Sequence, residues 1–331
     1  MIALRRLLAT ASLASCITLL SFPVMSQDFR LGLITPPSHH WTQAAQSFAE
    51  SLNAASDGRH QVSVFPAAQL GNEAQMVQQL QTGALDMAFL TVAEISNRVP
   101  EFGAWYAPYL VDNIDEAAAL LKSDAAEEMF DLLPQQAGLI GVGYGMAGMR
   151  QMMARSALNS PDDLSGMRVR ITPFDPIRDF YTALNTAPTP LPLPAVYDAL
   201  ANRQIDAIDM DFDSILIFRF YERAEHMMIS NHMMFPMVGV VSARVWRNLS
   251  EQDQELISSL MREELDQVIE TFRLQEAEQE AMLRERDIVI TEADRDAFAD
   301  SVSQWEAIWS EKSTRLATLR EAVEQIRHSQ E

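Results

Sequence analysis

Two arginines, Arg150 and Arg170, are the residues of this chain whose setting most clearly indicates binding chemistry. Arg170 belongs to an apolar segment, 167–171, that predicts a β-strand, and strand alternation places it on the same face as Arg168. A guanidinium stays charged at physiological pH, so a half-buried one needs an anionic partner. That partner is either an aspartate of the chain or the carboxylate of a ligand, which the planar guanidinium can bind through two parallel hydrogen bonds.

An acidic cluster surrounds the end of another predicted strand. It consists of Asp206, Asp209, Asp211 and Asp213. A calcium loop would need a glycine turn and a distal bidentate glutamate, and neither stands at the required position. Two interpretations remain open. The carboxylates stabilise the first turn of a helix that begins near Asp211, or some of them accept hydrogen bonds from a ligand.

Signatures of catalysis are scarce in this sequence. The chain lacks the His-Glu-x-x-His, Gly-x-Ser-x-Gly and Walker motifs, a cysteine pair, and any histidine spacing typical of zinc. Residues 143–148 match Gly-x-Gly-x-x-Gly, but a phosphate site needs a helix to follow, and residues 149–153 predict extended chain. We therefore expect a binding protein without enzymatic activity, metal or cofactor, in which 143–148 crosses between two lobes.

Alternating strands and helices must position these residues. Strands are predicted at 29–34, 61–65 and 84–90, with amphipathic helices at 41–55 and 73–82 between them. This βαβαβ order is typical of parallel strands that are joined by helical crossovers.

The pattern then continues and restarts. A helix over 114–136 with a break at Pro134 leads to a strand at 138–142. After Arg150 the alternation begins again, with the strand 167–171, helices at 176–184 and 195–202, and a strand at 205–208. Two rounds of alternation indicate two α/β lobes. Ser250 is predicted to cap a charged helix that runs to about Glu285 and is long enough to bridge both lobes.

The charge balance and the first residues bear on partners and location. The 331 residues carry a net charge of −21, which disfavours nucleic acid and anionic membrane surfaces as partners. Arg5 and Arg6, an apolar run over 7–22 and small residues before Gln27 predict that 1–26 is a secretory signal peptide and that the mature protein is periplasmic. Cys16, which follows Leu-Ala-Ser as in a lipobox, makes lipid anchoring the alternative.

Several stretches, spread over nearly the whole chain after residue 26, carry a family resemblance. They are Pro36-Pro37-Ser38-His39 with Trp41, then 65–71, 78–87, 96–103, 148–151, 160–170, 188–190, 196–200 and 220–222. The strongest is 160–170, which reads Ser-Pro-Asp-Asp-Leu-Ser-Gly-Met-Arg-Val-Arg. Together they resemble the periplasmic solute-binding proteins of tripartite ATP-independent (TRAP) transporters, of the C4-dicarboxylate-binding type.

The resemblance implies a two-lobe periplasmic binding protein fold of the α/β class. Each lobe would hold a mixed or parallel sheet, with crossover strands and a long helix spanning both. The first lobe would be 27–148 plus about 236–272, and the second 149–235 plus about 273–331. A small organic carboxylate would bind between the lobes and close them. The closed protein, expected to be a monomer, would deliver it to the small and large TRAP membrane subunits for ion-gradient-driven uptake.

The resemblance also implies which residues contact the ligand. The family's carboxylate-binding arginine falls on Arg170, and its frequent second arginine falls on Arg150. Its polar residue after the third strand falls on Thr91, and its acid after the second-lobe strand falls on Asp209. His39 lies in the loop after the first strand, which faces the ligand in the family. The wider candidate set adds Asp213, Met210, Glu73 and Phe235.

The chain departs from the family's common run Asp-Gly-Gln-Glu-Asn-Pro, because residues 206–211 read Asp-Ala-Ile-Asp-Met-Asp. Met210 replaces an amide that often contacts ligand, and Asp211 replaces a helix-opening proline. Losing an amide and gaining carboxylates favours a ligand with hydroxyl or amine donors, which a sugar acid fits best. Dicarboxylates, keto acids and amino-acid-like osmolytes are the alternatives, as is a receptor role in which a sensor kinase reads the closed form.

Overall fold

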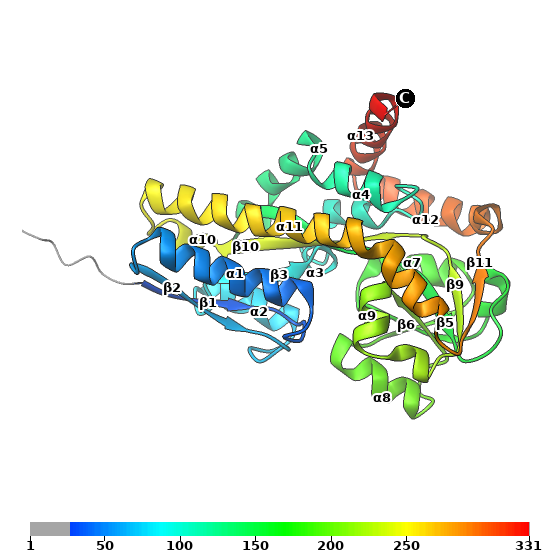
Figure 1. Ribbon diagram of the computed structural model, residues 1–331. Helices are drawn as coiled ribbons and strands as arrows, with labels where there is room; N and C mark the ends of the chain where they lie inside the picture. The colour runs from blue at the N-terminus through cyan, green and yellow to red at the C-terminus, as the bar shows by residue number, and fades with distance from the viewer. Residues whose placement is uncertain (1–26, 331) are drawn as a thin grey trace, which may run out of the picture.

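Two β-sheets, each covered by helices, organise the chain in the computed structural model (Figure 1), which describes residues 27–330. The predicted signal peptide and Cys16 lie outside the described residues. None of the helices within 27–330 combines the length and the apolar character needed to span a bilayer.

The first sheet has the strand order β2-β1-β3-β10-β4. Its strands are β1 (Gln27–Gly32), β2 (His60–Phe65), β3 (Met87–Thr91), β4 (Leu139–Met149) and β10 (Met234–Ser242). β1 pairs in parallel with β2 and β3, while β10 runs antiparallel to β3 and β4. The predicted parallel βαβαβ opening is confirmed, with α1 (His40–Ala55) and α2 (Glu73–Thr82) as the crossover helices.

The strand predicted at 84–90 and the helix predicted at 114–136 have different bounds in the structure. The strand expected at 84–90 begins only at Met87, because Gly83 ends α2 in a left-handed conformation (φ 78°) and a turn follows. The helix expected at 114–136 is interrupted at Ser123, whose side chain accepts a hydrogen bond from Ala126 N and starts a new turn. The resulting pieces are α4 (Ile114–Leu121), α5 (Asp124–Glu127), a 3₁₀ segment (Glu128–Leu132) and α6 (Leu133–Gln136), in whose first turn Pro134 is tolerated.

The second sheet has the strand order β11-β9-β5-β8-β6-β7. Its strands are β5 (Gln151–Ala154), β6 (Arg168–Ile171), β7 (Ala187–Pro190), β8 (Ala207–Met210), β9 (His226–Ile229) and β11 (Val289–Glu292). β6 is parallel to β7 and β8, whereas β5 is antiparallel to β8 and β9, so this sheet is also mixed. Its helices include α7 (Asp175–Ala183), α8 (Val196–Ala201) and α9 (Phe212–Ile217).

Extended chain connects the two sheets at two points. β4 passes into β5 through Arg150, and β9 returns to β10 through 230–233, with Arg150 N donating to Met233 O at 2.8 Å. The glycine-rich run 143–148 lies within β4 and forms no phosphate loop. Close packing explains one of its glycines, because a Cβ at Gly145 would lie 2.6 Å from Met237 Sδ.

A single helix, α11 (Glu251–Arg284), runs along both halves of the molecule (Figure 1), as predicted. Ser250 caps it, accepting a hydrogen bond from Asp253 N. Near its middle Glu264 accepts from Ser47 of α1 at 2.6 Å, and further along Gln279 donates to Asp213 of α9 at 3.1 Å. α11 therefore contacts helices of both halves of the molecule.

The last two helices of the chain pack on different halves of the molecule. α12 (Ala299–Lys312) packs on α7, and Trp305 Nε1 donates to Pro176 O at 2.8 Å. α13 (Arg315–Gln330) instead packs on α4, where Arg327 pairs with Glu116 at 3.0 Å. The final helix thus lies against the first half of the fold.

Candidate functional site

A cavity of about 600 Å³ is lined by residues from both sheets. Most of its wall follows the carboxyl ends of parallel strands, which is where α/β sheets place their ligand sites. On the first side these strands are β1, β2 and β3, and on the second side they are β6, β7 and β8. Seven predicted binding residues line the cavity: His39, Glu73, Thr91, Arg150, Arg170, Met210 and Phe235.

Arg170, on β6, is a buried cation of the cavity wall without an acidic partner. Its side chain is 2% exposed, and its Nε and Nη2 both donate to the carbonyl of Leu191, at 3.0 and 2.7 Å. Within residues 27–330 it forms no ion pair with a carboxylate. Burial, reinforced by the nearby Arg150 charge, lowers the pKa of Arg170 to about 9. Arg168, two residues earlier, is exposed and pairs with Asp206 at 2.7 Å.

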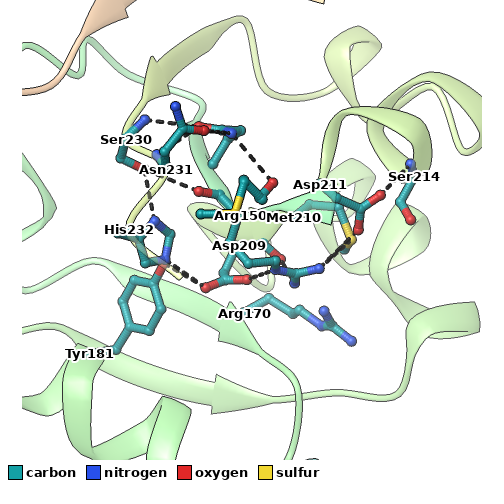
Figure 2. A network of polar contacts seen from close by, with 12 residues as sticks. Arg150, Arg170, Tyr181, Asp209, Met210, Asp211, Ser214, Ser230, Asn231 and His232 are labelled. Atoms are coloured by element: carbon teal, nitrogen blue, oxygen red, sulfur yellow. Dashed lines mark hydrogen bonds and ion pairs between the residues drawn. The ribbon is translucent and has the colours of Figure 1, made fainter. Parts of the chain in front are cut away.

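Arg150 is the arginine that forms the internal salt bridge. Its Nε pairs with Asp209, and its Nη1 donates to Asp211 Oδ2 at 3.0 Å. Its Cζ lies 4.2 Å from the ring centroid of Phe235, so an aromatic face covers the guanidinium. Figure 2 shows Arg170 beside this paired group, with no dashed contact to it.

Asp209, which was predicted to contact the ligand, lies outside the cavity lining and behind Arg150. It is 1% exposed, and its Oδ2 accepts from Tyr181 Oη at 2.9 Å and from His232 Nε2 at 3.1 Å (Figure 2). Burial alone would raise the pKa of Asp209, but Arg150 and then His232 lower it below its ordinary value. With both oxygens engaged inside the protein, Asp209 holds Arg150 in place.

Asp213, another residue of the predicted binding set, also lies outside the cavity lining. It sits in the first turn of α9, where its Oδ1 accepts from Gln279 of α11 and its Oδ2 lies 3.7 Å from His39 Nε2. Burial, and then the neighbouring Asp211 charge, raise the pKa of Asp213 to about 7. The reason for the difference is helical geometry: Asp213 turns toward α11, whereas Asp211 precedes the helix at the cavity.

His39 caps α1, because its Nδ1 accepts from Trp41 N at 3.1 Å. Burial, with a smaller contribution from His40, lowers the pKa of His39 to about 3, so the ring is neutral at physiological pH. His39 therefore contributes a neutral polar group to the cavity wall and no positive charge.

Glu73 and Thr91 form a linked pair on the first-sheet side. Thr91 N and Oγ1 donate to the two carboxyl oxygens of Glu73, at 2.6 and 3.0 Å. Burial raises the pKa of Glu73 to about 8, so this carboxyl group is largely protonated at pH 7. Glu73 thus adds polar hydrogen-bonding capacity to the cavity with little negative charge.

Several residues that line the cavity were not among the binding residues predicted from the sequence. They are chiefly Asp211, Trp41, Asn97, Thr172, Phe174, Ser214 and 192–195. Asp211 caps α9 as predicted, accepting from Ser214 N at 2.8 Å, and it lines the cavity as well. Position after the carboxyl ends of β6 and β7 is the signal that could have indicated Phe174 and 192–195. No group of three metal-ligating side chains occurs in the described part of the chain.

The fold and this cavity define the class of the molecule: it is a two-lobed solute-binding protein. The chain belongs to the DctP family, described as bacterial extracellular solute-binding protein, family 7, whose model matches residues 31–312. Members of this TRAP-type class bind small organic acids and work with the membrane subunits of a transporter. The chain is accordingly a transport component and not an enzyme.

Individual relatives are about one quarter identical in sequence to this chain over the aligned residues. The sialic acid-binding periplasmic protein SiaP of Vibrio cholerae is 24% identical over 259 residues, which is 78% of this chain and 81% of SiaP. A TRAP periplasmic solute-binding protein from Bradyrhizobium, solved with galacturonate, is 26% identical with a TM-score of 0.84, covering 90% of this chain and 100% of its own. The sugar acid binding protein DctPAm of Advenella mimigardefordensis, solved with galactonate, has a TM-score of 0.86 at 23% identity. The match covers 91% of this chain and 99% of DctPAm.

Proposed function

We propose that this protein binds a small organic acid, with a sugar acid as the favoured ligand, by placing the ligand's carboxylate on Arg170. The observation that carries the proposal is the buried Arg170 guanidinium, which lines the cavity without an acidic partner among residues 27–330. A desolvated cation of this kind is costly unless an anion arrives, and a carboxylate matches its planar donors.

The rest of the cavity wall supports a hydroxylated ligand. Asp211, Glu73 and Thr172 supply acceptors or hydroxyl groups, while Trp41, Phe174 and Phe235 supply flat apolar surface. A sugar acid combines a carboxylate, several hydroxyl donors and apolar C–H faces, so it can use all three parts of the wall. Galactonate and galacturonate, which occupy the two solved relatives described above, are therefore the first ligands to test.

The proposal includes closure of two lobes around the ligand. Residues of both sheets line one cavity, so a bound acid can contact both lobes and shift the population toward a closed form. We assign the lobes as 27–148 plus about 236–272, and 149–235 plus about 273–312, with α13 packed on the first. The closed monomer then docks on the small and large membrane subunits.

Binding and closure are expected together when the purified protein is titrated with aldonates and hexuronates. Calorimetry should give saturable binding, and ligand at 100 times its Kd should raise the free energy of unfolding by about 2.7 kcal/mol. Small-angle scattering of the saturated sample should give a smaller radius of gyration than the ligand-free protein. Binding with an unchanged radius would contradict closure, and no binding by any organic acid would contradict the proposal.

Export is expected to remove residues 1–26 and release a periplasmic protein that begins at Gln27. The arginine pair, the apolar run and the small residues before Gln27 are the reason. Mass spectrometry of the protein from a periplasmic fraction measures the new N-terminus. A chain that begins with an acylated Cys16 would instead establish lipid anchoring.

A further inference from the structure

The arginines and aspartates of the second-sheet side of the cavity balance each other in charge before any ligand binds. Arg150 and Arg170 contribute two positive charges, and Asp209 and Asp211 contribute two negative charges. All four side chains are buried, and the Asp211 and Arg170 side chains both line the cavity. One ligand carboxylate on Arg170 therefore already gives this buried group an excess negative charge.

The two aspartates of this group have different exposure to the ligand. Asp209 lies behind Arg150 and is enclosed by Tyr181 and His232. Asp211 faces the cavity, with Oδ2 accepting from Arg150 and Oδ1 accepting from Ser214 N. An ionised carboxylate has about four acceptor positions, so Asp211 retains capacity for a ligand's hydroxyl donors.

We propose that Asp211 is the residue that makes this cavity select a monocarboxylate bearing hydroxyl groups over a dicarboxylate. The inference rests on the proposed function and narrows it. Asp209 and Asp211 together outweigh the single charge of Arg150, so Arg150 offers no net attraction to a second carboxylate, and the charge of Asp211 repels one across a desolvated site. A hydroxyl group at the same place meets an acceptor instead.

The remaining ionisable groups of the cavity wall do not offset this effect. Glu94 is paired with Arg98, and His39 carries no positive charge at neutral pH. Glu73 is largely neutral at pH 7 and becomes negative above about pH 8, which would only strengthen the rejection of a second carboxylate. Burial raises the pKa of Asp211 above its ordinary value, and the Arg150 charge opposes that shift. Among the acids that line the cavity within residues 27–330, Asp211 is the one that forms an ion pair with Arg150.

The test compares sugar acids that differ only at one end. Galactonate and galactarate share a six-carbon chain and its secondary hydroxyl groups, but galactarate carries a second carboxylate where galactonate has a primary hydroxyl group; gluconate and glucarate form a second pair. Calorimetry at pH 7 should show the diacid of a pair binding at least tenfold more weakly to the wild-type protein. In Asp211→Asn this ratio of Kd values should shrink by about tenfold or more, because the isosteric amide keeps the cap and removes the charge.

Two further variants separate charge from structure. Asp211→Ser retains a capping side chain without charge and should shift the ratio in the same direction. Asp206→Asn removes one charge from the exposed pair with Arg168 and should leave the ratio unchanged. An unchanged ratio in folded Asp211→Asn and Asp211→Ser would overturn the role of Asp211 while leaving the proposed function intact. Wild-type protein that binds none of these acids, nor any other monocarboxylate, would refute both.

Discussion

Arg170→Ala is expected to weaken binding of the organic acid by about 30-fold to several-thousand-fold. The guanidinium is buried at the cavity and has no acidic partner within residues 27–330, so we expect the ligand's carboxylate to be the anion that pairs with it. Removing the guanidinium leaves the bound carboxylate desolvated and unpaired, which typically costs about 2–5 kcal/mol of binding free energy. Calorimetry on variants whose circular dichroism matches the wild type provides the measurement.

Two companion variants sharpen this expectation. Arg170→Lys should also bind weakly, because an ammonium lacks the planar pair of donors and cannot keep both bonds to Leu191 O while it binds a carboxylate. Arg168→Ala removes an exposed arginine from the same strand and should bind normally. If Arg170→Ala retains affinity within about threefold of the wild type, the ligand's anion is held elsewhere and our assignment fails.

Local patterns in the sequence predicted most of the fold. α2 has the predicted bounds, and α11 begins after Ser250 as its capping residue indicated. These signals are local. The spacing of the apolar residues and the capping side chain both act within a single helix or strand. The interruption at Ser123 and the position of α13 were not predictable in this way. α13 is located by contacts such as Arg327 with Glu116, which are far apart in sequence.

The candidate site shows the same limit. Both arginines were identified from sequence, but which of them binds an internal aspartate depends on chain segments about 60 residues apart. Asp209 was assigned to the ligand from its place in the family resemblance, which does not show that Tyr181 and His232 approach it from other elements. For Asp211 the sequence left a capping role and a ligand-accepting role open as alternatives, whereas in the structure the same carboxylate caps α9 and lines the cavity.

Arg150→Ala is expected to act mainly on stability, by lowering the free energy of unfolding. Its effect on which ligand the protein prefers is expected to be much smaller. The variant would leave Asp209 and Asp211 buried without their cation, and breaking a buried ion pair in this way typically costs about 3–5 kcal/mol. Arg170→Ala should cost less stability than Arg150→Ala, because Arg170 forms no ion pair among the described residues, whereas Arg150 pairs with both aspartates. Urea denaturation of both variants without ligand measures the difference, with Arg168→Ala as the surface control.

The loss in Arg150→Ala should also depend on pH, and the sign follows from the aspartates. In the wild type Arg150 helps hold the pKa of Asp209 below its ordinary value, so the pair stabilises the fold above about pH 4, and this contribution is lost as pH falls through the folded-state pKa. Without Arg150 the buried carboxyl groups take up protons more readily. The stability gap between wild type and variant should therefore be full at pH 7 and narrow toward pH 4. A gap that is equally wide at both values would mean that the lost packing of Arg150 under Phe235, and not its charge, accounts for the destabilisation.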